Sequence, residues 1–183
     1  MDMIDKFMKC PVFVFGAILG VSVIALAGGL VGQFVFDLPP CNLCILQRIP
    51  FVLAALWGVA GLVWPAARPA LLGLSALTFA SNSAMAIYHS GIERGWWDEA
   101  VGCSANFDFN TGAQSLMSQI TSAQVGSCAK IPWADPILGL SMANYNVALC
   151  AGMAVFCAIA LRYQLKHRNN SEDNAAVENK ETN

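Results

Sequence analysis

Charged residues divide the chain into four long apolar windows. No Asp, Glu, Lys or Arg falls inside the windows, which run from Lys9 to Asp37, Arg48 to Arg68, Arg68 to Glu93, and Asp135 to Arg162. Each window is near or above the ~20 residues that an α-helix needs to cross a bilayer. The pattern predicts four membrane-spanning helices, over about residues 11–36, 45–64, 69–92 and 136–161. We therefore expect an all-α membrane protein, a single four-helix bundle over residues 1–168 with a long loop between the third and fourth helices.

The polar stretches between and after the windows predict loops and a tail. Residues 37–44 and 93–135 are expected to connect helices, and the polar, acidic, aperiodic residues 169–183 are expected to form a disordered tail. Asp135 followed by Pro136 is typical of an N-cap with proline at the first helical position, so the fourth helix should begin there. Residues 115–120 form either a short helix in the membrane interface or an ordinary turn over the bundle.

Composition agrees with a chain that lies in a lipid bilayer. Of the 183 residues, 56% are hydrophobic and 12% are charged, and the mean hydropathy is +0.54. Soluble domains have about 25% charged residues. The net charge is −2 and the sequence has no basic cluster, so no nucleic-acid partner is expected.

Lys and Arg near the ends of the windows predict the orientation. One side of the membrane collects six of them, Lys6, Lys9, Arg68, Arg162, Lys166 and Arg168, and the other side collects three, Arg48, Arg94 and Lys130. This bias places both termini in the cytoplasm. Segments 37–44 and 93–135 then face outward, which in a bacterial inner membrane is the periplasm, where disulfides persist.

The seven cysteines fall into two groups by position. Cys10, Cys150 and Cys157 lie in or beside apolar windows, and we interpret them as small hydrophobic residues. The others lie on the outward side and at or beyond the window edges: Cys41, Cys44, Cys103 and Cys128. Structural zinc sites usually pair two Cys-x-x-Cys units, whereas 24 residues separate the last two cysteines here and no His joins the group, so no metal site is predicted. Two exported disulfides that only staple loops remain an alternative.

Cys41 and Cys44 have a spacing that suits redox chemistry better than stapling. A bridge that closes two residues restrains almost nothing, whereas a neighbouring thiol can resolve a mixed disulfide formed by the first. Pro39 and Pro40 end the preceding helix, so Cys44 should lie in the first turn of the next one, where free backbone N–H groups favour a thiolate. Arg48 follows at i+4 on the same face. Its guanidinium either reaches lipid head groups or stabilises the Cys44 thiolate and an anion beside it, such as a reduced membrane carrier.

Several features together resemble the DsbB family. They are "LPPCNLCILQR", the four spans, a following loop with two more cysteines, and "GLSMANYN" after Trp133, and the resemblance covers about residues 10–165. Members of this family are bacterial inner-membrane proteins that reoxidise the periplasmic dithiol oxidase DsbA and pass the electrons to a membrane quinone.

The resemblance implies a role for each site residue. Cys103–Cys128 would be the disulfide that meets the reduced DsbA-like partner, with Cys103 forming the mixed disulfide. Cys41–Cys44 would receive the electrons by internal exchange, and Cys44 would engage ubiquinone or menaquinone. Arg48 would lie at that quinone. His89 would either lie close to the same site or be a hydrogen-bonding histidine at the membrane interface.

Other assignments remain open at this point. Vitamin K epoxide reductases also use two cysteine pairs, but their loop pair precedes their Cys-x-x-Cys, the reverse of the order here. A non-enzymatic four-helix scaffold stapled by two disulfides is a candidate from a different class. A DsbI-type relative with a restricted partner is another, because the loop between Cys103 and Cys128 has its own sequence.

Overall fold

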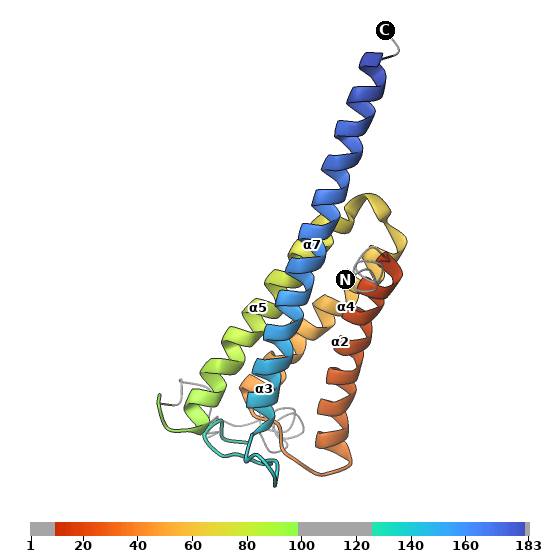
Figure 1. The fold of residues 1–183 in the computed structure, drawn as a ribbon. Helices are drawn as coiled ribbons and strands as arrows, with labels where there is room; N and C mark the ends of the chain where they lie inside the picture. Colours follow the sequence, from red (N-terminus) through yellow and green to blue (C-terminus); the bar gives the residue numbers. More distant parts are fainter. Residues whose placement is uncertain (1–9, 99–125, 182–183) are drawn as a thin grey trace, which may run out of the picture.

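The computed structural model describes residues 10–98 and 126–181, whose long helices form one elongated bundle (Figure 1). The helices are α2 (Pro11–Phe34), the short α3 (Asn42–Leu46), α4 (Arg48–Val63), α5 (Arg68–Glu93) and α7 (Met142–Glu181), with a 3-10 turn, η1 (Pro65–Ala67), before α5. Four segments are long and apolar enough to cross a membrane, namely residues 11–34, 42–63, 65–93 and 142–166. The predicted all-α, four-helix membrane bundle is confirmed.

The bundle core is built from side chains of all four long helices. Helix α5 packs along α7, α2 packs along α4, and α4 also contacts α5. Phe51 and Phe79 meet edge to face, with ring centroids 6.3 Å apart, and Phe15 is fully buried beside them in the same cluster. Cys150 and Cys157 are also fully buried there, as expected of small hydrophobic residues, while Cys10 is exposed.

Helix α7 differs from the prediction at its start. It begins at Met142 and not at Pro136, because residues 135–140 form a turn of their own. Asp135 Oδ2 accepts a hydrogen bond from Leu138 N at 2.8 Å, and Gly139 has a φ of +65° that a helix does not allow. The cap of α7 is Ser141, whose hydroxyl oxygen accepts from Asn144 N at 3.3 Å. The expected N-cap at Asp135 is therefore corrected: its carboxylate caps a turn.

The far end of α7 also differs from the prediction. Residues 169–181, for which the sequence predicts a disordered tail, continue the helix, which extends beyond the other helices in Figure 1. The chain has no Gly or Pro after Gly152, and Ala175, Ala176, Glu178 and Lys180 are good helix formers. The polar side chains of this segment indicate that it lies outside the membrane, but the segment contains no Gly or Pro to end the helix.

A close contact between α2 and α4 gives a stability prediction. A Cβ atom on Gly61 would lie 2.1 Å from the Phe15 ring, whereas one on Gly20 would meet nothing within 4 Å. Because Phe15 is fully buried, its ring has little room to move. We expect Gly61→Ala to destabilise the protein by ~1–3 kcal/mol, the usual cost of overpacking. Thermal unfolding in detergent should show a lower midpoint for Gly61→Ala and no loss for the matched control Gly20→Ala. Equal midpoints would contradict this packing.

Candidate functional site

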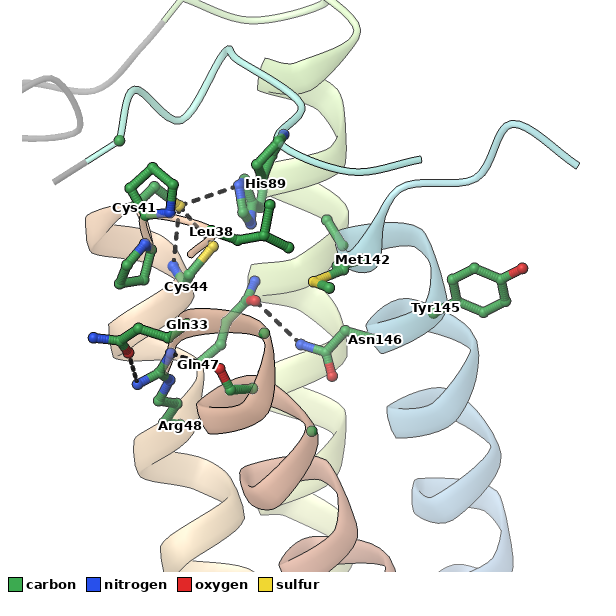
Figure 2. A pocket seen from close by; sticks show the side chains of 18 of the residues that line it. Gln33, Leu38, Cys41, Cys44, Gln47, Arg48, His89, Met142, Tyr145 and Asn146 are labelled. Atoms are coloured by element: carbon green, nitrogen blue, oxygen red, sulfur yellow. Dashed lines mark hydrogen bonds between the residues drawn. The ribbon is translucent and has the colours of Figure 1, made fainter. Parts of the chain in front are cut away.

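A cavity of about 720 Å³ opens at the end of the bundle where α3 lies. Its walls come from α2, the 38–41 segment, α3, α4, α5, residues 126–132 and α7. Four of the residues predicted from the sequence line it, namely Cys41, Cys44, Arg48 and His89. Figure 2 shows them around one space, with the two cysteines on one side and Arg48 below them. The structure therefore brings together side chains that lie up to 48 positions apart. Cys103, a further predicted residue, lies outside the described part of the chain.

Helix α3 fixes the geometry of the cysteine pair. Cys41 is the N-cap of α3 and has the extended backbone angles (φ −80°, ψ 166°) that are typical of this position. Its sulfur accepts a hydrogen bond from the backbone N–H of Cys44 at 3.2 Å. The S–H of Cys41 points at the sulfur of Cys44, 2.8 Å away. The structure thus holds the pair as two adjacent thiols, close enough to exchange a disulfide.

The two sulfur atoms differ in their surroundings. The hydrogen bond from the Cys41 S–H to Cys44 raises the pKa of the Cys41 thiol well above its usual range, and burial raises this pKa further. Cys41 therefore keeps its proton, and Cys44 is the member of the pair placed to carry negative charge. The prediction that Cys44, in the first turn of its helix, is the thiolate agrees with this hydrogen-bond direction.

Residues 126–128, which precede α7, lie directly against the cysteine pair. Gly126 forms a parallel bridge with Cys41, and its N–H donates to the carbonyl oxygen of Pro40 at 3.2 Å. The backbones are so close that a Cβ atom on Gly126 would be 3.0 Å from the Pro39 oxygen. This contact brings Cys128, which is fully buried, into one cluster with Cys41 and Ile92. A loop cysteine and the Cys-x-x-Cys pair thus meet on the same side of the bundle.

His89 lies next to Cys41. Its Nε2 lies 3.4 Å from the Cys41 sulfur and 3.8 Å from Oε1 of Glu93, one turn later on α5. Both side chains are 4% exposed. Glu93 in turn accepts a hydrogen bond from the Ser141 hydroxyl, which ties α5 to the cap of α7. The sequence predicts His89 at a quinone, and the structure places it in the same cavity, next to the cysteine pair.

The position of His89 also bears on metal binding. The ligand atoms of Cys41, Cys44 and His89 lie within 4.8 Å of one another, so a His does join the cysteines, contrary to the sequence-based argument against zinc. The two sulfur atoms are 2.8 Å apart. This distance lies between the ~2.05 Å of a disulfide bond and the roughly 3.8 Å that separates two thiolates bound tetrahedrally at ~2.3 Å from one zinc ion.

Arg48 is turned into the bundle. Its Nη1 donates to Gln33 Oε1 at 2.9 Å and its Nη2 to the Gly29 carbonyl oxygen at 3.4 Å, both on α2 (Figure 2). Of the two interpretations of Arg48, these contacts favour the one in which its charge serves the cavity over the one in which it reaches lipid head groups. Cys44 and Arg48 line the same space, although the structure places them on two helices, α3 and α4, that meet at Gln47, and not on one face of a single helix as predicted.

Sequence reasoning missed several polar residues at this site. Gln33 orients Arg48, and Gln47 accepts a hydrogen bond from Asn146 Nδ2 at 3.2 Å. Glu93 stands beside His89. Isolated amides inside apolar windows were the available signal, because a polar side chain in a membrane helix usually faces the protein interior.

The comparisons with known proteins agree on one family. The family model described as disulfide bond formation protein DsbB matches residues 11–160. Disulfide bond formation protein B of Chromohalobacter salexigens is 32% identical, over 80% of this chain and 87% of that protein. Its counterpart in Dechloromonas aromatica is 29% identical, over 82% and 93%. An uncharacterized protein of Rickettsia prowazekii is 28% identical, over 80% and 85%. No solved structure matches the chain.

Proposed function

Because the chain belongs to the DsbB family of disulfide bond formation proteins, we propose that it reoxidises a DsbA-type dithiol protein and passes the electrons to a membrane quinone. The observation that carries this proposal is the convergence of Cys41, Cys44 and Cys128 beside one cavity at the end of a membrane bundle. Partner thiols arrive from water and quinone from lipid, so a relay needs one cysteine pair for each. Cys128, a loop cysteine packed against the Cys41–Cys44 pair at the end of the bundle, meets that need.

The proposed orientation places this end of the bundle in the periplasm of a bacterial inner membrane. Arg68 lies at the opposite end, where its Nε donates to the Gly61 carbonyl oxygen at 3.0 Å. The surplus of Lys and Arg on the Arg68 side assigns that end to the cytoplasm. The cysteine pair and the adjoining loop then face the compartment in which disulfides are made.

Thiol–disulfide exchange connects the two cysteine pairs in this proposal. A partner thiolate attacks Cys103 of a Cys103–Cys128 disulfide, which forms a mixed disulfide and releases Cys128 as a thiolate. Cys128 then attacks the sulfur of Cys41 in a Cys41–Cys44 disulfide. The Cys41–Cys128 bond forms, the Cys41–Cys44 bond breaks, and Cys44 leaves as a thiolate. The second thiol of the partner then displaces Cys103 and forms the partner disulfide. Cys103 in turn attacks Cys128, which restores the Cys103–Cys128 bond and releases Cys41, so that Cys41 and Cys44 are the reduced pair. The burial of Cys41 and Cys128 in one cluster supports this exchange.

The cavity fits a quinone head group. Ligand sites are typically ~300–1,000 Å³ and mostly apolar with a few placed polar groups, and this one has about 720 Å³ with Arg48, Gln47 and Cys44 in its wall. When bound, ubiquinone or menaquinone would take two electrons and two protons, so that two thiols become one disulfide. The chain itself supplies a thiolate at Cys44, a fixed positive charge at Arg48, and walls that hold the head group next to both.

Removal of the Arg48 charge should weaken use of quinone. We expect Arg48→Leu to raise the quinone KM roughly 10- to 100-fold, which is the scale of a hydrogen bond to a charged group. The assay follows the oxidation of a reduced DsbA-type protein with a short-chain quinone as the acceptor. Arg68→Leu is the matched control, because Arg68 lies at the other end of the bundle and should leave that KM unchanged. An unchanged KM for Arg48→Leu would remove Arg48 from the quinone site.

A further inference from the structure

Gln47 presents an unused hydrogen-bond donor to the cavity. Its side chain is 6% exposed and lines the cavity wall, and its Nε2 has no partner among the described residues. A buried amide N–H without a partner destabilises the protein, so the group should have an acceptor. The oxygen of the same amide, Oε1, accepts a hydrogen bond from Asn146 Nδ2 (Figure 2).

A chain of three hydrogen bonds runs through the bundle to this amide. Asn82 Nδ2, on α5, donates to the Cys150 sulfur at 3.4 Å. Cys150, on α7, donates to Asn146 Oδ1 at 3.1 Å, and Asn146 Nδ2 donates to Gln47 Oε1 at 3.2 Å. In each of these three hydrogen bonds the donor lies on the Asn82 side and the acceptor on the Gln47 side. Gln47 Nε2 is therefore the terminal donor of the chain, and donors in such a series polarise one another.

Polar groups this deep in a membrane bundle need a reason. Asn82 is fully buried in a window where an apolar residue would be easier to accommodate. The sequence gives Cys150 no part in the cysteine relay. The hydrogen bonds provide a reason, since in this arrangement the Gln47 amide directs its oxygen to Asn146 and leaves its Nε2 for the cavity.

We propose that Gln47 Nε2 donates a hydrogen bond to a carbonyl oxygen of the quinone head group, and that Asn146, Cys150 and Asn82 are positioning residues for it. This inference rests on the proposed function. A quinone carbonyl is an acceptor without a proton of its own, so it matches a group that offers only N–H. Arg48, the next residue, provides a charged donor in the same wall, and Gln47 adds a neutral one.

Binding of a carbonyl-labelled short-chain ubiquinone to the purified protein tests this without turnover. We expect the infrared carbonyl stretch of the bound quinone to lie at the lowered frequency of a hydrogen-bonded group in the wild type. Gln47→Met, of similar volume but without a donor, should lose that lowering for one carbonyl. Its Kd should rise roughly three- to tenfold, the scale of one neutral hydrogen bond.

Variants of Cys150 test the hydrogen bonds between Asn82 and Gln47 separately from general packing. Cys150→Ser keeps an O–H donor for Asn146 and should bind quinone like the wild type, whereas Cys150→Ala breaks the chain and should shift the Kd in the direction of Gln47→Met. Asn146→Leu added to Gln47→Met should cause no further loss. Trp57→Phe is the matched control, because Trp57 Nε1 is also buried without a partner among the described residues but lies in the core packing outside the cavity wall.

The possible outcomes test the role of Gln47 separately from the proposed function on which it rests. A wild type that binds and reduces quinone, with Gln47→Met unchanged in both Kd and carbonyl frequency, overturns the role of Gln47 and leaves the proposed function standing. Identical binding by Cys150→Ser and Cys150→Ala overturns the positioning chain. A folded wild type that binds no quinone overturns both.

Discussion

Cys44→Ser reduces no quinone, on our account, even with an excess of reduced dithiol partner. Cys44 lies in the first turn of α3, its sulfur accepts a hydrogen bond from the Cys41 S–H, and it lines the cavity with Arg48. A serine hydroxyl neither ionises near neutral pH nor forms a disulfide, so the last carrier of the relay is lost. We expect the rate to fall below roughly a thousandth of the wild-type rate, as when a covalent nucleophile is removed. Quinone absorbance under anaerobic conditions measures this.

The same substitution at Cys10 is the control for that experiment. Cys10 is exposed and precedes α2, away from the cavity wall. Cys10→Ser should therefore keep the wild-type rate. Quinone reduction by Cys44→Ser at a rate comparable with that of Cys10→Ser would show that another group delivers the electrons.

Cys41→Ser should stop turnover at a different point. The loop pair Cys103–Cys128 still accepts electrons from the partner, but Cys128, buried against Cys41, then has no disulfide to attack. We expect oxidation of about one equivalent of partner dithiol followed by no further reaction, whether or not quinone is present. Alkylation of the remaining partner thiols, separated by gel mobility, counts the equivalents.

Repeated turnover by Cys41→Ser would contradict the order of the relay. It would mean that the loop pair passes electrons to quinone directly. The matched comparison is Cys157→Ala, which removes a fully buried cysteine of the core and should oxidise many equivalents.

Much of the fold could be predicted from the sequence, because charge is excluded from membrane spans. Three of the four predicted spans agree with the helices to within about three residues at each end, within the usual uncertainty of helix boundaries. The fourth failed at both ends for local reasons. Asp135 and Pro136 form a turn with Gly139 just as readily as a helix start, and polarity in residues 169–181 shows that they lie outside the membrane, not that they are unfolded.

The position of the Cys-x-x-Cys pair and of Arg48 could be predicted from local spacing, but the surroundings of the site could not. Cys41, Cys44 and Arg48 line one cavity, while Cys103 lies outside the described residues. The partners that orient the site come from other helices. Gln33 on α2 and Asn146 on α7 are amides in apolar windows, and only the packing of the helices decides which of them face Arg48 and Gln47. The contact of His89 with Cys41 joins residues 48 positions apart and has no local signal.

Anaerobic quinone consumption by the purified wild-type protein in detergent tests the central claim most directly. A reduced DsbA-like dithiol protein is the electron donor, and ubiquinone and menaquinone are each supplied in turn. The account predicts that at least one of them is consumed, with one quinone reduced for every two donor thiols oxidised. A folded wild type that consumes neither quinone would contradict the account. The cysteines would then be staples in a membrane scaffold.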